Sequence, residues 1–307
     1  MRFFLFCSLL ALSLAACQHD GPAHHQSAAR KGTVVRIDSF PSAYLPARNL
    51  DIYLPPGFDA ADTSMRYPVL YMHDGQNLFD TTTAYGGVEW QVDEVLERLV
   101  DADSVRSCIV VGIWNIGDRR MAEYMPQGAF NHLADSLQRL FMQTAQNPAL
   151  SDSYLRFLTS ELKPYIDSLY PTLPDREDTF IAGSSMGGLI SLYAITRYPR
   201  IFGGAACLST HWPITLDGSR PYIGDTVVAY FRERLPDPSD HRLYFDFGTE
   251  TLDQYYEPFQ RQMDEALRQA GYTEGENWLT RKFEGHEHNE AYWARRLHEP
   301  LHFLLAK

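Results

Sequence analysis

Eight short runs of hydrophobic residues predict eight β-strands along the chain. They are Thr33–Ser39, Asn49–Leu54, Pro68–His73, Cys108–Trp114, Thr179–Gly183, Gly204–Leu208, Arg242–Phe247 and Trp278–Phe283. Several of these runs contain almost no polar residue, which is typical of strands buried on both faces of a mostly parallel sheet. The pattern therefore favours a large sheet that is covered on both sides.

Helical patterns separate the predicted strands. Apolar residues recur every three or four positions in two segments, ending at Leu169 and at Ala270, and Gly271 stops the second helix. The members of the two stripes are Leu155, Leu158, Leu162, Ile166 and Leu169, and Phe259, Met263, Ala266 and Ala270. Alternating strands and helices predict one doubly wound α/β domain with helices on both faces of the sheet. The mixed stretch Asn115–Met142 predicts an insertion over the carboxyl edge of that sheet.

Residues 1–16 predict a signal peptide. Met1 and Arg2 precede an apolar run from Phe3 to Ala16, which is too short to span a bilayer. The run ends in Leu14-Ala15-Ala16-Cys17, which resembles the bacterial lipobox. This resemblance implies cleavage before Cys17 and lipidation of its thiol, so we expect an exported lipoprotein anchored to a membrane of the cell envelope. An ordinary signal peptide followed by an accidental Cys17 is the alternative.

The segment 17–32 predicts a flexible tether, and residues 33–307 predict a single domain. His19, His24 and His25 lie in the tether and could bind a metal, but a solvated linker is the simpler interpretation. Cys108 and Cys207 lie in apolar runs, which indicates buried free thiols and no disulfide framework.

Composition and charge narrow the possible functions. The chain has 307 residues, of which 45% are hydrophobic and 21% are charged, and this excludes disordered and collagenous proteins. Its formal net charge of -12 argues against a nucleic-acid binder that depends on phosphate contacts. The high content of Tyr, 18 residues, suits a pocketed enzyme or a sugar-binding surface.

The sequence Gly183-Ser184-Ser185-Met186-Gly187 matches the G-x-S-x-G motif. It follows a predicted strand and precedes a predicted helix, which is the context of a nucleophile elbow. In such a turn small flanking residues permit a strained backbone that exposes the serine hydroxyl. Ser185 is therefore the candidate nucleophile. The alternative is a glycine-rich turn in a protein without this activity.

The candidate base lies in Gly285-His286-Glu287-His288-Asn289-Glu290, between the last strand and the end of the chain. The start of this segment resembles the zinc motif H-E-x-x-H, but its fifth position is Glu290, so we expect no metal. We favour His288 as the base because it lies closer to the following helix and to Trp293. His286 is the alternative and could instead hydrogen-bond within the loop.

The candidate acid lies in the loop after Arg242–Phe247, which reads Gly248-Thr249-Glu250-Thr251-Leu252-Asp253. Glu250 and Asp253 could each orient the imidazole and stabilise its cationic form. We prefer Glu250, with Asp253 next. Asp253 could also cap the following helix, although Pro258 predicts that this helix begins later. Asp246 ranks third, because it should point to the sheet edge or solvent.

Acyl transfer also needs hydrogen-bond donors for an oxyanion. The backbone N–H of Met186 follows the nucleophile at a helix start. A second donor should come from the loop His73-Asp74-Gly75-Gln76-Asn77-Leu78-Phe79, and we nominate Gln76. A plain polar turn is the alternative interpretation of this loop.

Together these motifs resemble the putative-esterase family of α/β hydrolases. That family includes enterochelin esterase-like proteins, feruloyl and acetylxylan esterases, S-formylglutathione hydrolase and the mycolyltransferases. The resemblance runs from about Thr33 to the C-terminus and rests on His73–Phe79, Gly183–Gly188, Gly248-Thr249-Glu250, and His288-Asn289-Glu290 with Trp293.

The resemblance implies an α/β-hydrolase fold, a triad of Ser185, His288 and a carboxylate after the seventh strand, and Gln76 as an oxyanion donor. It leaves Glu250 and Asp253 open, because relatives place this carboxylate at different offsets. Seven further residues fall in loops expected around the pocket: Trp90, Asn115, Arg119, Glu123, Tyr124, His211 and Trp212.

The leading hypothesis is a lipid-anchored serine esterase that needs no cofactor and works through an acyl-enzyme. Its substrates would be small-molecule or polysaccharide-linked esters at the cell envelope, such as acylated glycans or siderophore-like lactones. An acyltransferase that uses the same triad is the first alternative. A non-catalytic glycan-binding lipoprotein is the second.

Overall fold

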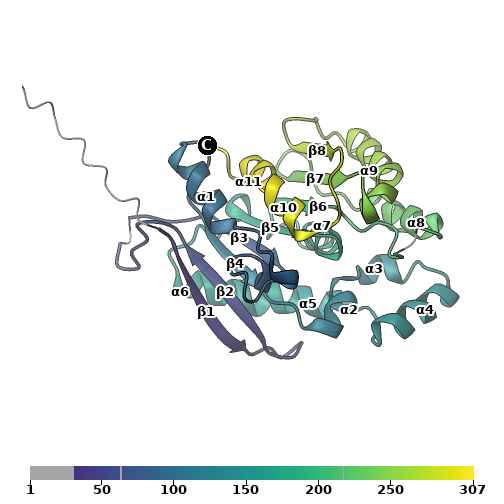
Figure 1. Ribbon diagram of the computed structural model, residues 1–307, viewed down its shortest axis with the longest axis horizontal. Coiled ribbons are helices and arrows are strands. Elements are labelled where there is room, and N and C mark those ends of the chain that lie inside the picture. The colour runs from purple at the N-terminus through teal and green to yellow at the C-terminus, as the bar shows by residue number, and fades with distance from the viewer. Residues whose placement is uncertain (1–30, 63, 217) are drawn as a thin grey trace, which may run out of the picture. The chain divides into compact units, whose positions relative to one another are not determined.

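An eight-stranded sheet lies at the centre of the computed structural model, which describes residues 31–62, 64–216 and 218–307 (Figure 1). The strands are β1 (Thr33–Phe40), β2 (Arg48–Leu54), β3 (Val69–His73), β4 (Ile109–Ile113), β5 (Thr179–Ser184), β6 (Gly204–Leu208), β7 (Arg242–Gly248) and β8 (Trp278–Phe283). Their order is β1-β2-β4-β3-β5-β6-β7-β8. The pairs β1–β2 and β2–β4 are antiparallel, and all other neighbours in this sheet are parallel. The predicted mostly parallel eight-stranded sheet is confirmed.

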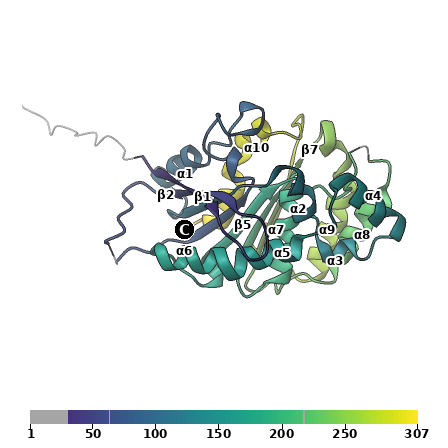
Figure 2. The same ribbon diagram turned by 90° about the horizontal axis from the view of Figure 1, so that it is seen from below.

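Helices cover both faces of the sheet (Figures 1 and 2). One face carries α5 (Ser151–Phe157), a π-helical segment (Leu158–Leu162), α6 (Lys163–Leu169), α7 (Met186–Arg197), α8 (Pro221–Arg232) and α9 (Glu257–Gln269). The other carries α1 (Val92–Asp101), α10 (Glu290–Arg296) and α11 (His298–Leu305). Each face of the sheet has its own hydrophobic core, and successive residues of a strand point alternately into the two. In β3, Val69 and Tyr71 pack on the first face and Leu70 and Met72 on the second. Burial on both faces explains why the central strands β3, β4 and β6 are apolar almost throughout.

The predicted insertion, Asn115–Met142, folds into several short helices. They are the 3-10 helix η3 (Gly117–Arg119), α2 (Arg120–Tyr124), α3 (Gln127–Phe130) and most of α4 (Asp135–Ala145). An ion pair ties this segment to the sheet, because the Arg48 guanidinium donates to both carboxylate oxygens of Glu123 at 2.9 and 3.1 Å. Both side chains are fully buried. Glu123, which the sequence predicts near the pocket, instead anchors the insertion in the structure.

Lys31–Lys307 form one compact unit. The predicted signal peptide, the lipidated Cys17 and nearly all of the tether lie outside the described residues. Within the described residues, no helix is both long enough and apolar enough to cross a membrane. Cys108 and Cys207 are buried free thiols, as predicted.

Candidate active site

Ser185 occupies a sharp turn between β5 and α7. Its φ of 60° and ψ of -120° are strained for a residue with a side chain. A Cβ added to Gly183 would lie 2.9 Å from the carbonyl carbon of Gly187, so only glycine lets strand and helix approach this closely. The Ser185 N–H donates to the Leu208 carbonyl at 2.8 Å, which holds the turn against β6. This geometry is that of a nucleophile elbow.

The His288 imidazole reaches Ser185 from the loop after β8. Its Nε2 lies 2.9 Å from the Ser185 hydroxyl oxygen. The ring is held edge-to-face between Trp293, with centroids 4.9 Å apart, and Tyr256, at 5.7 Å. The backbone N–H of His288 also donates to the Thr251 hydroxyl at 2.8 Å. The structure therefore brings together the serine and the histidine that sequence analysis favoured.

The carboxylate beside His288 belongs to Asp253 and not to Glu250, which corrects the order of preference. Asp253 Oδ1 lies 2.6 Å from His288 Nδ1, and the Asp253 side chain is fully buried. Glu250 is exposed, and its backbone N–H donates to the His286 carbonyl at 3.0 Å. The reason is the turn after β7: Thr251, with a φ of 52°, starts the 3-10 helix η6 (Thr251–Tyr255), and this helix carries Asp253 inward.

The second oxygen of Asp253 is also occupied. Oδ2 accepts hydrogen bonds from the Ser209 hydroxyl at 2.6 Å and from the Gly248 N–H at 2.5 Å. Burial alone would raise the pKa of Asp253, but the hydrogen bond and charge of His288, together with these two donors, outweigh it and lower the pKa. Asp253 is therefore ionised at neutral pH.

Asp246 and His286 were the lower-ranked candidates for the acid and the base, and both make contacts that support the structure around the site. Asp246 is buried, not facing solvent, and its Oδ1 lies 3.0 Å from a guanidinium nitrogen of Arg296. Burial raises the pKa of Asp246 even though Arg296 opposes the shift. The His286 ring stacks on Phe283, and its carbonyl accepts from the N–H groups of Thr249 and Glu250. The backbone carbonyl of His286, and not its ring, thus fastens the acid-bearing loop.

Ser185 and His288 open into a cavity of about 390 Å³. Polar side chains form most of its wall. The lining residues are Asp74, Gln76, Asn77, Tyr85, Asn115, Gly117, Arg120, Ser184, Ser185, His288, Glu290 and Trp293. Tyr85 is 76% exposed at the rim. An exposed aromatic ring beside polar groups offers a ligand both apolar contact area and hydrogen-bonding partners.

The loop that carries Gln76 is held by an ion pair at its first residue. Asp74, with a φ of 59°, accepts from the Arg120 guanidinium at 2.8 and 2.7 Å and from the Asn115 amide at 2.8 Å. Burial alone would raise the pKa of Asp74, but Arg120 and Asn115 hold it below its usual value. Gln76 lies in the 3-10 helix η1 (Gly75–Asn77), and its carbonyl accepts from the Thr83 hydroxyl at 2.7 Å.

The two nominated oxyanion donors lie at helix starts. Gln76 lines the cavity, and Met186 is the first residue of α7, directly after Ser185. Backbone N–H groups in the first turn of a helix have no partner within that helix, so they are suited to bind an anion.

Of the seven pocket-loop residues named from the sequence, Asn115 lines this cavity and the other six do not. His211 lies behind His288, where its Nδ1 is 2.6 Å from the Tyr256 hydroxyl, and burial lowers the pKa of His211 to about 3. Trp90 packs on Trp293. The other four residues also lie outside the cavity lining. Glu123 forms its ion pair with Arg48, Tyr124 is buried beside Asp74, Trp212 lies in the core, and Arg119 does not line the cavity.

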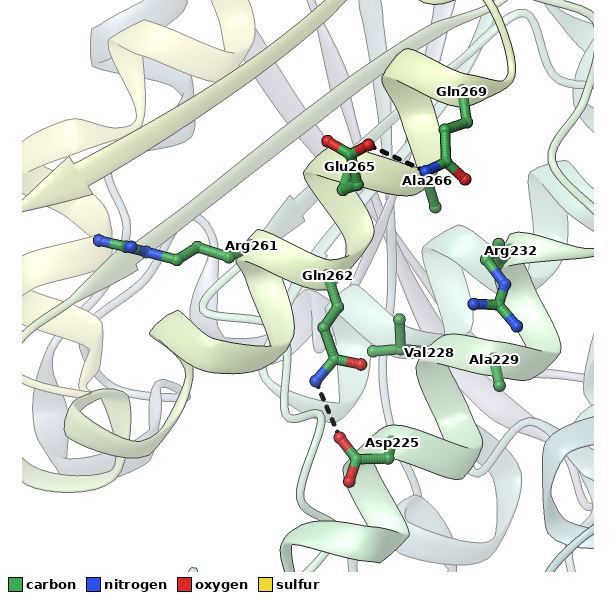
Figure 3. A pocket seen from close by; sticks show the side chains of 9 residues that line it. All are labelled: Asp225, Val228, Ala229, Arg232, Arg261, Gln262, Glu265, Ala266 and Gln269. Carbon is green, nitrogen blue, oxygen red and sulfur yellow. Dashed lines mark hydrogen bonds between the residues drawn. The ribbon is translucent and has the colours of Figure 1, made fainter.

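A separate hollow of about 340 Å³ lies between α8 and α9 (Figure 3). Two pairs of its side chains bond to one another, Gln262 to Asp225 and Gln269 to Glu265, and its lining includes no candidate catalytic residue. In the described part of the chain, no group of three or more His, Cys, Asp or Glu side chains is arranged to hold a metal.

Comparison with known proteins identifies the family. The family model described as "Putative esterase" matches residues 45–304. The chain belongs to this esterase family. At 24% identity over 266 residues, 85% of this chain and 93% of the relative, it is similar to the uncharacterized protein YbbA of Bacillus subtilis (strain 168).

Solved structures of esterases share the fold of this esterase. A ferulic acid esterase matches with a TM-score of 0.62 and 22% identity, covering 90% of this chain and 98% of its own. The enterobactin esterase FES from Shigella flexneri matches with a TM-score of 0.61 and 18% identity, covering 89% of this chain and 59% of its own. The family match identifies the chain as an ester hydrolase, and these neighbours show its α/β-hydrolase fold.

Several residues at the site of this esterase were not found from its sequence. Arg120 rather than its neighbour Arg119 lines the cavity, and Ser209, Tyr256 and Arg296 surround the acid and the base. The available signal was the spacing of Arg296, three residues after Trp293, which places both side chains on one face of a helix but does not reveal their partners.

Proposed function

We propose that this ester hydrolase is a serine esterase with Ser185, His288 and Asp253 as its catalytic triad. A continuous chain of contacts supports the proposal: Ser185 Oγ to His288 Nε2 at 2.9 Å, and His288 Nδ1 to Asp253 Oδ1 at 2.6 Å. Both distances lie within the range required of a nucleophile, its base and the group that orients the base.

In the first half of the proposed reaction, His288 Nε2 accepts the Ser185 proton as Oγ attacks the ester carbonyl. The ionised Asp253 holds the proton of the imidazole on Nδ1 and stabilises the imidazolium that forms. The tetrahedral oxyanion is received by the N–H groups of Met186 and Gln76. His288 then protonates the leaving alcohol, and an acyl-Ser185 ester remains.

In the second half, His288 takes a proton from water, and the resulting hydroxide attacks the acyl-enzyme. Collapse of the second oxyanion releases the carboxylic acid and returns the proton to Ser185. An acceptor alcohol in place of water would give the acyltransferase alternative with the same residues.

We place the substrate among esters of hydroxyl-rich alcohols, such as acylated glycans or siderophore-like esters. The cavity wall supports this class, because Asn77, Asn115 and Glu290 offer hydrogen-bonding groups and Tyr85 offers an exposed ring. Two structural neighbours, a ferulic acid esterase and an enterobactin esterase, are named for substrates that agree with this class.

The decisive experiment exchanges Ser185 for Ala. We expect hydrolysis of a short p-nitrophenyl ester and labelling by a fluorophosphonate probe both to disappear while the unfolding temperature is kept. Ser191→Ala is the matched control, because Ser191 is also a buried serine and its hydroxyl donates to the Gly187 carbonyl. Unchanged turnover in Ser185→Ala would reject the triad. Product analysis with an added sugar acceptor separates hydrolysis from acyl transfer.

The lipid anchor is part of the proposal and is supported by the sequence alone. Lipidation at Cys17 would hold the esterase at the cell envelope, where such esters occur. Cys17→Ser should move the protein from the membrane fraction to the soluble fraction. Retention of the variant in the membrane fraction would contradict lipidation at this residue.

A further inference from the structure

A buried hydrogen-bond network lies on the side of Asp253 that faces away from His288. The Ser209 hydroxyl is at its centre, 2.6 Å from Asp253 Oδ2. Two donors reach the same hydroxyl oxygen: Trp293 Nε1 at 3.0 Å and Arg296 Nη2 at 2.6 Å. Ser209 has no exposed surface, so water does not compete for these bonds.

The donors determine which way the Ser209 hydroxyl points. A hydroxyl has one proton and two lone pairs. Indole and guanidinium nitrogens can only donate, so Trp293 and Arg296 occupy both lone pairs of Ser209. The single Ser209 proton is then directed at Asp253 Oδ2. Together with the Gly248 N–H, which donates to the same oxygen at 2.5 Å, this proton fixes Oδ2 and leaves Oδ1 to face His288.

The backbone at Ser209 is held in an unfavourable conformation to make these contacts. Its φ is 41°, in the left-handed region, although serine carries a side chain. The Ser209 N–H donates to the backbone carbonyl of Asp246 at 2.9 Å and to its Oδ1 at 3.1 Å. The residue thus lies at the carboxyl end of β6, where β7 and η6 can meet it.

Arg296 supplies the positive charge of the network. Its Nη2 lies 3.0 Å from Asp246 Oδ1 and 3.7 Å from Asp253 Oδ2, and the guanidinium is stacked on the Phe283 ring. Arg296 is 1% exposed, so one buried cation is shared by two buried carboxylates. Arg296 and Trp293 are three residues apart on α10, the helix that begins two residues after His288.

We propose that Ser209 is a positioning residue for the acid of the triad. Ser209 accepts hydrogen bonds from Trp293 and Arg296 and orients Asp253 toward His288. The helix α10, which follows His288, thereby also fixes the acid. The inference rests on the proposed triad and adds to it a hydroxyl that touches neither the substrate nor the reacting atoms.

The test is a double-mutant cycle of Ser209→Ala and Asp253→Asn, with the acylation rate of Ser185 by a p-nitrophenyl ester and KM as readouts. If Ser209 acts through Asp253, Ser209→Ala lowers the rate on the order of 10- to 100-fold with KM within about twofold. In the Asp253→Asn background the same substitution then costs less than about threefold. Ser191→Ala should cost less than about twofold in both backgrounds.

The proposal is overturned if Ser209→Ala lowers the acylation rate of the otherwise wild-type protein by less than about threefold. It is also overturned if the factor by which Ser209→Ala lowers this rate differs by less than about threefold between the wild-type and Asp253→Asn backgrounds. If Ser209→Ala does not fold, Arg296→Lys replaces it and should show the same dependence on Asp253. Failure of the triad itself is seen separately, because Ser185→Ala or Asp253→Asn alone would then retain full turnover.

Discussion

Asp253→Asn, paired with Glu250→Gln, tests which carboxylate serves the proposed base. Asparagine has nearly the shape of aspartate, and the surroundings decide how its amide is turned. Ser209 and Gly248 both donate hydrogen bonds to Oδ2, so the amide oxygen must occupy that position. The amide NH2 then takes the place of Oδ1 and faces His288 Nδ1. In the wild type, Oδ1 lies 2.6 Å from this nitrogen.

An NH2 donor at this position reverses the imidazole tautomer. Nδ1 must become an acceptor, and the single proton of neutral His288 moves to Nε2, which faces Ser185. Nε2 can then no longer accept the serine proton. The equivalent change in serine proteases lowers kcat by about 10⁴, which corresponds to about 5.4 kcal/mol of activation free energy. Glu250→Gln should stay within about twofold, because this exposed side chain has no role in the network.

The assay is steady-state hydrolysis of a short p-nitrophenyl ester, with unfolding temperatures measured for both variants. A folded Asp253→Asn variant that keeps more than about a tenth of the wild-type kcat would refute this role for Asp253. Loss of activity in Glu250→Gln on the scale expected for Asp253→Asn would refute it equally, because the Glu250 side chain is exposed and Asp253 is the carboxylate bonded to His288.

Three further predictions concern stability and reactivity. Glu123→Ala leaves Arg48 buried without its partner and should lower the free energy of unfolding by about 3–5 kcal/mol in urea; a loss below about 1 kcal/mol would argue against it. Burial raises the pKa of Asp264, so its charge destabilises the fold as pH rises above the normal carboxyl range. Asp264→Asn should therefore be more stable at pH 7, with the gain vanishing in acid; a gain that persists at about pH 3 would contradict the assignment. Burial raises the pKa of Cys207, and it raises the pKa of Cys108 to about 12. In protein lacking residues 1–17, a thiol reagent should therefore label neither cysteine in the native state and both in denaturant. Rapid labelling of the native protein would contradict this.

The fold was largely predictable because its signals are local. Each predicted strand lies within one residue of the observed ends. For the central strands β3, β4, β5 and β6, which are buried at every position, the mainly apolar run leaves little choice of structure. The elbow at Ser185 was predictable for the same reason: its glycines are required by the turn in which they lie. Neither inference needed a contact with a distant part of the chain.

The acid could not be chosen in this way. Glu250 and Asp253 follow the same strand at similar distances along the chain, and both are carboxylates. The choice depends on the left-handed turn at Thr251, which leaves Glu250 exposed and carries Asp253 inward. It also depends on Ser209 and Arg296, which reach Asp253 from the end of β6 and from α10.

The sequence by itself thus determined the sheet, its covering helices, the elbow and the segment that holds the base, because hydrophobic periodicity and turn chemistry act between neighbouring residues. Only the tertiary structure decided which carboxylate faces His288, which arginine lines the cavity and which hydroxyl orients the acid. Those choices are made by side chains from several elements meeting in a buried space, where each polar atom must find a partner, and no linear pattern records such a meeting.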